Sequence, residues 1–251
     1  MSAQAAPVMV VTGGGRGIGA ATSRLAAQRG YTVCVNYLRN RDAAESVVRE
    51  IESSGGSAKA VAGDIASESD VVRLFGEAAK LGAIRALVNN AGILERQARL
   101  ADMEAARFER VFAINITGAF LCAREAVRRM STRHGGAGGV IVNVSSMASR
   151  LGSPGEYVDY AASKGAIDSL TIGLAKEVAA EGIRVNAVRP GVIYTEIHAS
   201  GGEAGRVDRV KSTVPMQRGG QPDEVARAIL WLCSDESSYS TGTFIDVSGG
   251  R

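Results

Sequence analysis

A short buried strand followed at once by a glycine turn and a helix constrains this chain more than any other feature. Val8-Met9-Val10-Val11 is apolar and rich in β-branched residues, as in a strand covered on both faces of a parallel sheet. The stretch from Thr12 to Gly19 follows directly, and a helical pattern then runs to Gly30. Parallel strands need crossover connections, so this unit predicts an α/β fold.

The same alternation continues to the end of the chain. Further strands are expected at residues 31–37, 58–62, 86–88, 140–144, 183–188 and 243–247, with helical patterns between them, including residues 102–129 and 157–181. No stretch resembles a linker, and 251 residues suffice for a large core. We therefore expect one α/β domain over residues 1–251.

Composition and charge exclude several classes of protein. Lys+Arg of 29 against Asp+Glu of 26 gives a net charge of +3, too small to imply a nucleic-acid or membrane partner. The three cysteines lie far apart in apolar surroundings, and no metal-ligand cluster surrounds them. No signal peptide or transmembrane stretch is recognisable. These features favour a reduced, cytoplasmic protein without a metal site.

The glycine turn indicates a dinucleotide site. A pyrophosphate must approach the N–H groups at the positive end of a helix, and only glycine leaves room for that approach. A tight turn that merely packs the helix closely is the alternative interpretation. The predicted contacts in this unit are Gly13, Gly15, Arg16, Gly17, Ile18 and Gly19.

The second strand bears on the choice between NADP and NAD. It ends at Asn36 and Tyr37, where NAD-binding proteins carry an acidic residue for the ribose. Arg39 follows closely, as does Arg41, while Arg16 projects from the glycine turn. Cations without a carboxylate suit a 2′-phosphate, so NADP(H) is preferred and NAD(H) remains possible. Ordinary surface charge is the alternative role for each arginine.

Later strand ends supply further candidate contacts. Asp64 is positioned to accept a hydrogen bond from the adenine amine with Ile65 beside the ring, although on spacing alone a turn role is favoured for Asp64. Two carboxamides followed by small residues suit a strand end that passes close to a cofactor, and they equally suit a turn. The candidates at the other strand ends are Asn90, Ala91, Gly92, Pro190, Gly191, Ile193 and Thr195.

Tyr160 and Lys164 are four residues apart in a helical pattern and so share one helix face. A phenol has a pKa near ~10, and a neighbouring ammonium favours its phenolate form. When a tyrosine and a lysine at this spacing occur without other motifs, they are usually a half-buried aromatic residue and a solvated lysine beside it. Asn115 stands in an apolar helical setting, where a buried carboxamide needs partners. Ser146 ends the fifth strand, where ligands bind in open α/β sheets.

In combination, these motifs closely resemble the short-chain dehydrogenase/reductase family. They are Thr-Gly-x-x-x-Gly-x-Gly at residues 12–19, Asn-Asn-Ala-Gly at 89–92, Ser146, Tyr160-x-x-x-Lys164 and Pro190-Gly191, and the likeness spans residues 8–250. The resemblance implies a single-domain Rossmann fold, with a doubly wound seven-stranded parallel sheet and helices on both faces.

The resemblance also implies roles for four catalytic residues. Tyr160 would exchange a proton with the substrate oxygen, and Ser146 would hold that oxygen by a hydrogen bond. Lys164 would lower the pKa of Tyr160 and bind the nicotinamide ribose. Asn115 would anchor a water molecule that relays protons to Lys164.

The interval from Ser146 to Tyr160 is one residue longer than is common in the family, whose usual spacing would place Met147 in the serine position. Methionine has no donor for a carbonyl oxygen, so Ser146 is assigned and Ser145 is the less favoured alternative. The extra residue is expected within residues 153–159. Tyr157 is excluded as the acid, and the two histidines, His134 and His198, are interpreted as surface or loop residues.

An NADP-dependent oxidoreductase acting on a carbonyl compound or secondary alcohol is therefore the leading interpretation. Similarity extends to glucose 1-dehydrogenase-like enzymes and to 3-oxoacyl-carrier-protein reductases, which would require cations for an acidic carrier, here Arg124, Arg128, Arg129 and Arg133. A non-catalytic redox sensor that binds the dinucleotide is the alternative class. The family implies a homotetramer, and the polar, Gly-rich residues 198–214 suit a mobile lid over a small-molecule substrate.

Overall fold

The computed structural model describes residues 6–251 and contains one seven-stranded parallel sheet with helices on both faces. The strands run in the order β3-β2-β1-β4-β5-β6-β7, and every pairing between neighbours is parallel. Their bounds are β1 Val8–Val11, β2 Thr32–Tyr37, β3 Ser57–Ala62, β4 Ile84–Asn89, β5 Gly139–Val144, β6 Ile183–Pro190 and β7 Phe244–Val247. The predicted doubly wound fold and all seven strands are confirmed.

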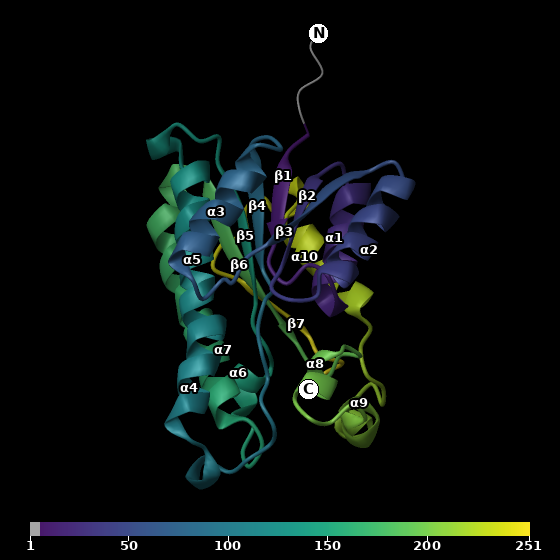
Figure 1. The fold of residues 1–251 in the computed structure, drawn as a ribbon. Coiled ribbons are helices and arrows are strands. Elements are labelled where there is room, and N and C mark those ends of the chain that lie inside the picture. The colour runs from purple at the N-terminus through teal and green to yellow at the C-terminus, as the bar shows by residue number, and fades with distance from the viewer. Residues whose placement is uncertain (1–5) are drawn as a thin grey trace.

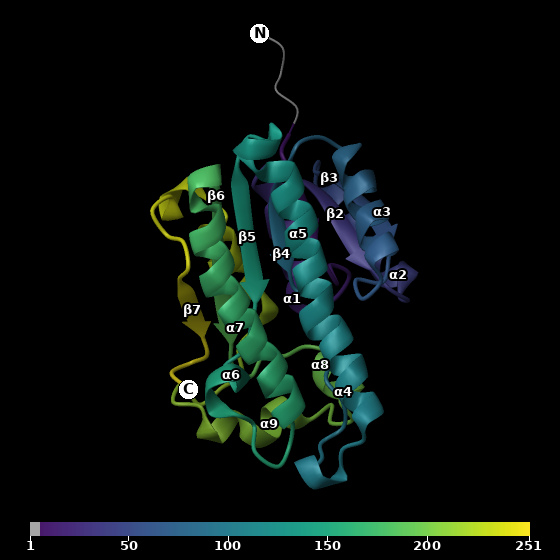
Figure 2. The same ribbon diagram turned by 90° about the vertical axis from the view of Figure 1, so that its left-hand side faces the viewer.

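Three long helices cover each face of the sheet (Figures 1 and 2). One layer contains α1 (Gly17–Gln28), α2 (Arg41–Ser53) and α10 (Pro222–Leu232). The opposite layer contains α3 (Glu68–Ala79), α5 (Ala119–Met130) and α7 (Val158–Val178), with α4 (Ala105–Phe112) extending the line of α5. None of the helices within residues 6–251 is both long enough and apolar enough to cross a membrane.

Strand β1 shows why the apolar runs in the sequence do not alternate with polar residues. All four of its residues are completely buried. Met9 and Val11 pack into the core beneath α1, α2 and α10, whereas Val8 and Val10 pack into the core beneath α3, α5 and α7. Successive side chains of a strand point to opposite faces, so both faces of a doubly covered sheet demand apolar residues.

The direction of winding reverses between β1 and β4, which are neighbours in the sheet although two strands separate them in sequence. Loops at the carboxyl ends of strands diverge at such a reversal and leave a crevice between them. The glycine loop after β1 and residues 89–92 after β4 both border this crevice. The candidate site lies here.

Two segments differ in detail from their sequence patterns. The expected helix over residues 102–129 is interrupted by a π-helical turn, Ala113–Gly118, between α4 and α5. The polar, Gly-rich residues 198–214 include most of α8 (Ile197–Ser200) and all of α9 (Arg206–Val210), and their motion as a lid stays a prediction. Figure 1 places both short helices beyond the carboxyl ends of the strands.

Candidate active site

One cavity of about 1290 Å³ at the carboxyl ends of the strands gathers nearly all the predicted site residues. It exceeds the roughly 300–1,000 Å³ of an ordinary small-molecule pocket, as a site for a dinucleotide plus a substrate requires. Of the candidate residues, only Gly19 and Asn115 lie outside its lining. The predicted residues that line it are Gly13, Gly15, Arg16, Gly17, Ile18, Asn36, Tyr37, Arg39, Asp64, Ile65, Asn90, Ala91, Gly92, Ser146, Tyr160, Lys164, Pro190, Gly191, Ile193 and Thr195.

The start of α1 is built to face an anion. Its N-cap residue, Arg16, makes no side-chain capping hydrogen bond, and no acidic residue occupies the first turn. Uncapped N–H groups at a helix N-terminus favour a negatively charged ligand. Gly17 has φ +52°, and a Cβ at Gly19 would collide with the carbonyl of Gly13. The glycine loop therefore fits the pyrophosphate of a dinucleotide.

Asn36 and Asn90 both hold the glycine loop in place. The Asn36 Nδ2 donates to the carbonyls of Val61 and Gly63 at 3.3 and 3.0 Å, and its Oδ1 accepts from the Gly13 N–H at 3.3 Å. Asn90 Nδ2 donates to Thr12 and Gly13 carbonyls at 2.9 and 3.2 Å. Both amide hydrogens of the buried Asn36 are thus satisfied within the protein. This residue lines the cavity but positions the loop.

The three arginines near the second strand differ in their surroundings. Arg41 pairs with Glu45 at 2.6 Å and lies outside the cavity lining. Arg16 and Arg39 are exposed, line the cavity and form no ion pair with any residue in the 6–251 range. Of the three arginines, these two alone line the cavity, where an arginine can form charge-assisted hydrogen bonds with an anion.

Asp64 and Ile65 form the edge of the cavity after β3. The Asp64 Oδ1 accepts a hydrogen bond from the Ala66 N–H at 2.9 Å, as in an Asx turn. The turn role favoured from the sequence is therefore present. Ile65 is buried, with 6% of its surface exposed, and still lines the cavity.

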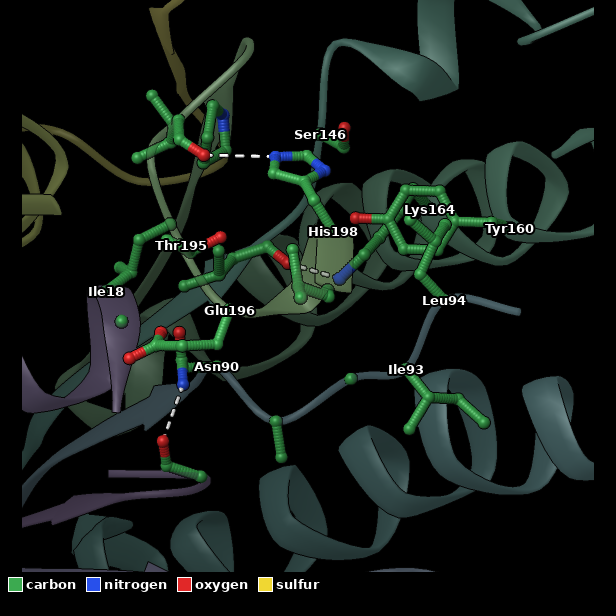
Figure 3. A pocket seen from close by; sticks show the side chains of 18 of the residues that line it. Ile18, Asn90, Ile93, Leu94, Ser146, Tyr160, Lys164, Thr195, Glu196 and His198 are labelled. Atoms are coloured by element: carbon green, nitrogen blue, oxygen red, sulfur yellow. Dashed lines mark hydrogen bonds between the residues drawn. The ribbon is translucent and has the colours of Figure 1, made fainter. Parts of the chain in front are cut away.

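Tyr160 and Lys164 lie one turn apart on α7, as their spacing predicts. The Lys164 Nζ is 5.6 Å from the centroid of the Tyr160 ring and donates to the carbonyl of Val144 at 2.7 Å. Figure 3 shows both side chains entering the cavity beside Ser146. The end of β5 and the first turns of α7 together position the three groups.

The pKa values of this pair differ from the expectation. Desolvation raises the pKa of Tyr160 to about 12, and the Ser146 hydroxyl opposes this rise only in part. Desolvation also lowers the pKa of Lys164 to about 8, although the negative charge of Asp168 acts in the opposite direction. Burial thus disfavours the charged form of both groups in the protein alone, and the lowering of the phenol pKa by Lys164 stays a prediction.

The two adjacent serines, Ser145 and Ser146, differ in their hydrogen bonds. Ser145 is buried, and its hydroxyl donates to Asp168 Oδ1 at 2.6 Å. The other oxygen of Asp168, Oδ2, accepts from both Nε and Nη2 of Arg189. Ser146 Oγ accepts from the Ala148 N–H at 3.1 Å and lines the cavity. Both serines line the cavity, but the Ser145 hydroxyl is held by Asp168, whereas the Ser146 hydroxyl interacts with that of Tyr160, which favours the assignment of Ser146 over Ser145.

Asn115 lies in the π-helical turn, outside the cavity lining but next to it. Its Oδ1 accepts from the Ile93 N–H at 2.8 Å, while its Nδ2 donates to the Ile93 carbonyl at 3.0 Å and to Ser163 Oγ at 3.1 Å. A Cβ built on Gly92 would lie 3.3 Å from Asn115 Oδ1 and 3.7 Å from Lys164 Nζ, so the two side chains flank this glycine. π-helical turns are frequent at functional sites. The proton-relay role of Asn115 stays a prediction.

Sequence reasoning missed the far end of the cavity. His198 lies on α8 and lines the cavity, so its interpretation as a surface or loop residue is corrected. In Figure 3 its ring projects toward Ser146 and Tyr160. Tyr157, Glu156 and Arg206 also line this end. Only the tertiary arrangement of α8 and α9 brings them together, so no sequence motif marks them.

Comparison with known proteins identifies the family. A family model described as enoyl-(acyl carrier protein) reductase matches residues 13–251. A crystal structure of a short-chain type dehydrogenase/reductase from Mycobacterium marinum superposes with a TM-score of 0.91 at 34% identity, over 98% of this chain and 96% of that one. The chain belongs to the short-chain dehydrogenase/reductase family. Its members act as oxidoreductases on alcohol or ketone groups and use nicotinamide dinucleotides, and this chain is an oxidoreductase of that kind.

Two further relatives are similar over nearly their whole lengths. The uncharacterized oxidoreductase YgfF of Escherichia coli (strain K12) is 62% identical over 97% of this chain and 99% of its own. A 3-oxoacyl-[acyl-carrier-protein] reductase of Synechocystis sp. (strain ATCC 27184 / PCC 6803 / Kazusa) is 38% identical over 100% of this chain and 98% of its own.

Proposed function

We propose that this protein, acting as a single domain, interconverts a carbonyl compound and a secondary alcohol with NADP(H) as the preferred dinucleotide. The observation that carries the proposal is one cavity that holds Tyr160, Ser146 and Lys164 together with the uncapped start of α1. Two arginines without a carboxylate partner among residues 6–251 line the same cavity. The dinucleotide supplies or accepts the hydride. Side chains of this chain transfer the proton and orient the substrate oxygen.

Tyr160 acts as the acid in the reductive direction. Because its pKa is raised to about 12, the phenol keeps its proton throughout the neutral range and can give it to a developing alkoxide. Ser146 donates a hydrogen bond to the same oxygen and so fixes the carbonyl relative to Tyr160. Lys164, anchored by the Val144 carbonyl, brings a positive charge to the cavity wall below pH 8 and holds the nicotinamide ribose.

Reduction of a carrier-bound acyl group is not favoured by the surface of α5. Arg124 pairs with Glu68 at 2.7 Å, and Glu125 accepts from both Arg128 and Arg129 at 2.7 and 2.5 Å. Arg133 lies 3.3 Å from Glu181. The cations considered for a carrier protein are thus compensated by neighbouring carboxylates, which weakens their attraction for an acidic partner.

A homotetramer is part of the proposal because two helices of one layer carry exposed apolar side chains. Phe120 on α5 and Ile172 on α7 both face solvent in the single chain. Large exposed apolar residues on neighbouring helices suit a helix-to-helix contact between copies. Sedimentation of the purified protein would measure the state, and a monomer would remove this part of the proposal.

The function is tested by titration of the protein with NADPH and with NADH, followed by fluorescence, and by a screen of ketones, alcohols and acyl thioesters for absorbance change. Tighter binding of NADPH with turnover of a ketone or alcohol is expected. A preference for NADH would contradict the roles of Arg16 and Arg39. Binding of the dinucleotide without turnover of any compound would favour the alternative class, a non-catalytic redox sensor.

A further inference from the structure

Three buried polar atoms at the far end of the cavity have no hydrogen-bond partner in the described part of the chain. They are Tyr157 Oη, His198 Nδ1 and Arg206 Nη1, and all three residues line the cavity. Buried polar atoms are almost always hydrogen-bonded, and each one left without a partner costs free energy. When several such atoms line one cavity, a ligand that supplies the missing partners is the direct explanation.

The hydrogen bond of His198 determines what its free nitrogen requires. Its Nε2 lies 3.0 Å from the carbonyl oxygen of Ile193, which can only accept. The proton is therefore on Nε2, and Nδ1 carries a lone pair. Burial lowers the pKa of His198, so the ring stays neutral and Nδ1 stays an acceptor. The missing partner of Nδ1 is consequently a donor, such as a hydroxyl group.

Tyr157 and Arg206 offer the complementary groups. Tyr157, only 2% exposed, precedes α7 and lies one turn before Tyr160. The Arg206 guanidinium stands over its ring, 5.0 Å from the centroid, and pairs through Nη2 with Glu156 at 2.5 Å. The Tyr157 hydroxyl and the remaining Arg206 nitrogen are donors. They suit oxygen acceptors.

The charges at this end of the cavity cancel. Arg206 and Arg209 both contact Glu156, and Arg209 also pairs with Glu203 at 2.5 Å. Two cations therefore face two carboxylates, while His198 is neutral. A carboxylate or phosphate group on a substrate would find no uncompensated positive charge here.

We propose that the substrate is a neutral hydroxylated compound, with a hydroxyl group next to the reacting carbonyl or alcohol carbon. That hydroxyl donates to His198 Nδ1, and the substrate's oxygens accept from Tyr157 and Arg206. This placement agrees with Figure 3, where the His198 ring projects toward Ser146 and Tyr160. The inference rests on the proposed function. An apolar acyl chain in the same place would leave all three polar atoms without a hydrogen bond, although Arg206 Nη1 lies 3.6 Å from Glu203 Oε2; enzymes discriminate strongly against mismatches of this type.

The test compares substrates that differ by one hydroxyl. The ratio of kcat/KM for cyclohexane-1,2-diol to that for cyclohexanol, with NADP⁺, is expected to be at least about tenfold in favour of the diol. Tyr157→Phe and His198→Leu are each expected to lower that ratio about tenfold. The matched controls are Tyr239→Phe and His134→Leu, at exposed positions outside the cavity lining, and they leave the ratio unchanged.

Thermal unfolding separates a recognition role from a structural one. Tyr157→Phe removes only a hydroxyl that lacks a partner within residues 6–251, so its melting temperature is expected to stay the same or to rise. A lower melting temperature with an unchanged substrate ratio would overturn the inference, as would equal kcat/KM values for diol and cyclohexanol in the natural protein. Absence of turnover of any alcohol or ketone with either dinucleotide would instead refute the proposed function itself.

Discussion

Replacing Asn36 by aspartate distinguishes a residue that holds the glycine loop from one that contacts the cofactor. The two side chains have nearly the same shape, but Asn36→Asp removes the two hydrogen bonds that Nδ2 donates to the carbonyls of Val61 and Gly63. Because Asn36 is only 2% exposed, water cannot replace the lost donors. At roughly 1–3 kcal/mol for each of the two acceptors left unsatisfied, the loss in free energy of unfolding is about 2–6 kcal/mol.

For a chain of this size, that loss corresponds to a fall of roughly 4–24 °C in melting temperature, measured at one fixed protein concentration. The pH dependence has a definite sign. Burial raises the pKa of the introduced carboxyl, so the unfolded chain loses that proton first and stability falls as pH rises above ~4. The defect should therefore be larger at pH 8 than at pH 5.5.

Asn40→Asp is the matched control. Asn40 is exposed and caps α2 by accepting from the Ala43 N–H at 3.0 Å, a role that aspartate performs equally well. Its stability should change by less than about 0.5 kcal/mol. A stable Asn36→Asp variant that now prefers NADH would refute the loop-holding role and return Asn36 to direct contact with the ribose.

Further predictions concern charge. Arg39→Ala should raise the Kd for NADPH about 10- to 100-fold and leave that for NADH unchanged, while Arg41→Ala, which removes an arginine outside the cavity lining, should alter neither. The kcat/KM for reduction should fall as pH rises through about 8, where Lys164 loses its proton, and Asp168→Asn should move this fall to lower pH because it removes the charge that raises the Lys164 pKa. Stability should rise over the same interval, since the unfolded chain keeps the lysine proton up to about 10.5. A pH-independent rate between 6 and 9.5 would contradict this role of Lys164.

The sheet was predictable because doubly covered strands must be apolar throughout. Each of the seven runs became a strand, and the turns after them became the cavity rim. Spacing also placed Tyr160 and Lys164 correctly, since the period of a helix is fixed. The sequence could therefore predict which residues lie near one another at the catalytic centre.

The environments of individual side chains were harder to predict from the sequence. Asn36 was expected to contact the cofactor, but its two amide hydrogens go to the carbonyls of Val61 and Gly63, and its Oδ1 accepts from the Gly13 N–H. The Lys164 ammonium was expected to lower the phenol pKa, but desolvation by burial raises that pKa in the protein alone. No sequence pattern indicated that His198 lines the cavity, because α8 is a helix of only four residues whose position depends on tertiary contacts. These features depend on burial and on partners distant in sequence, which local patterns do not encode.

The decisive measurement is turnover by Tyr160→Phe under conditions where dinucleotide binding is followed separately. Loss of the phenol proton donor should lower kcat by about 10²–10⁴-fold, while the Kd for NADPH changes little. Tyr239→Phe, at a fully exposed position, should behave as the natural protein. Turnover by Tyr160→Phe at the natural rate would contradict the proposal that this phenol is the acid of the reaction.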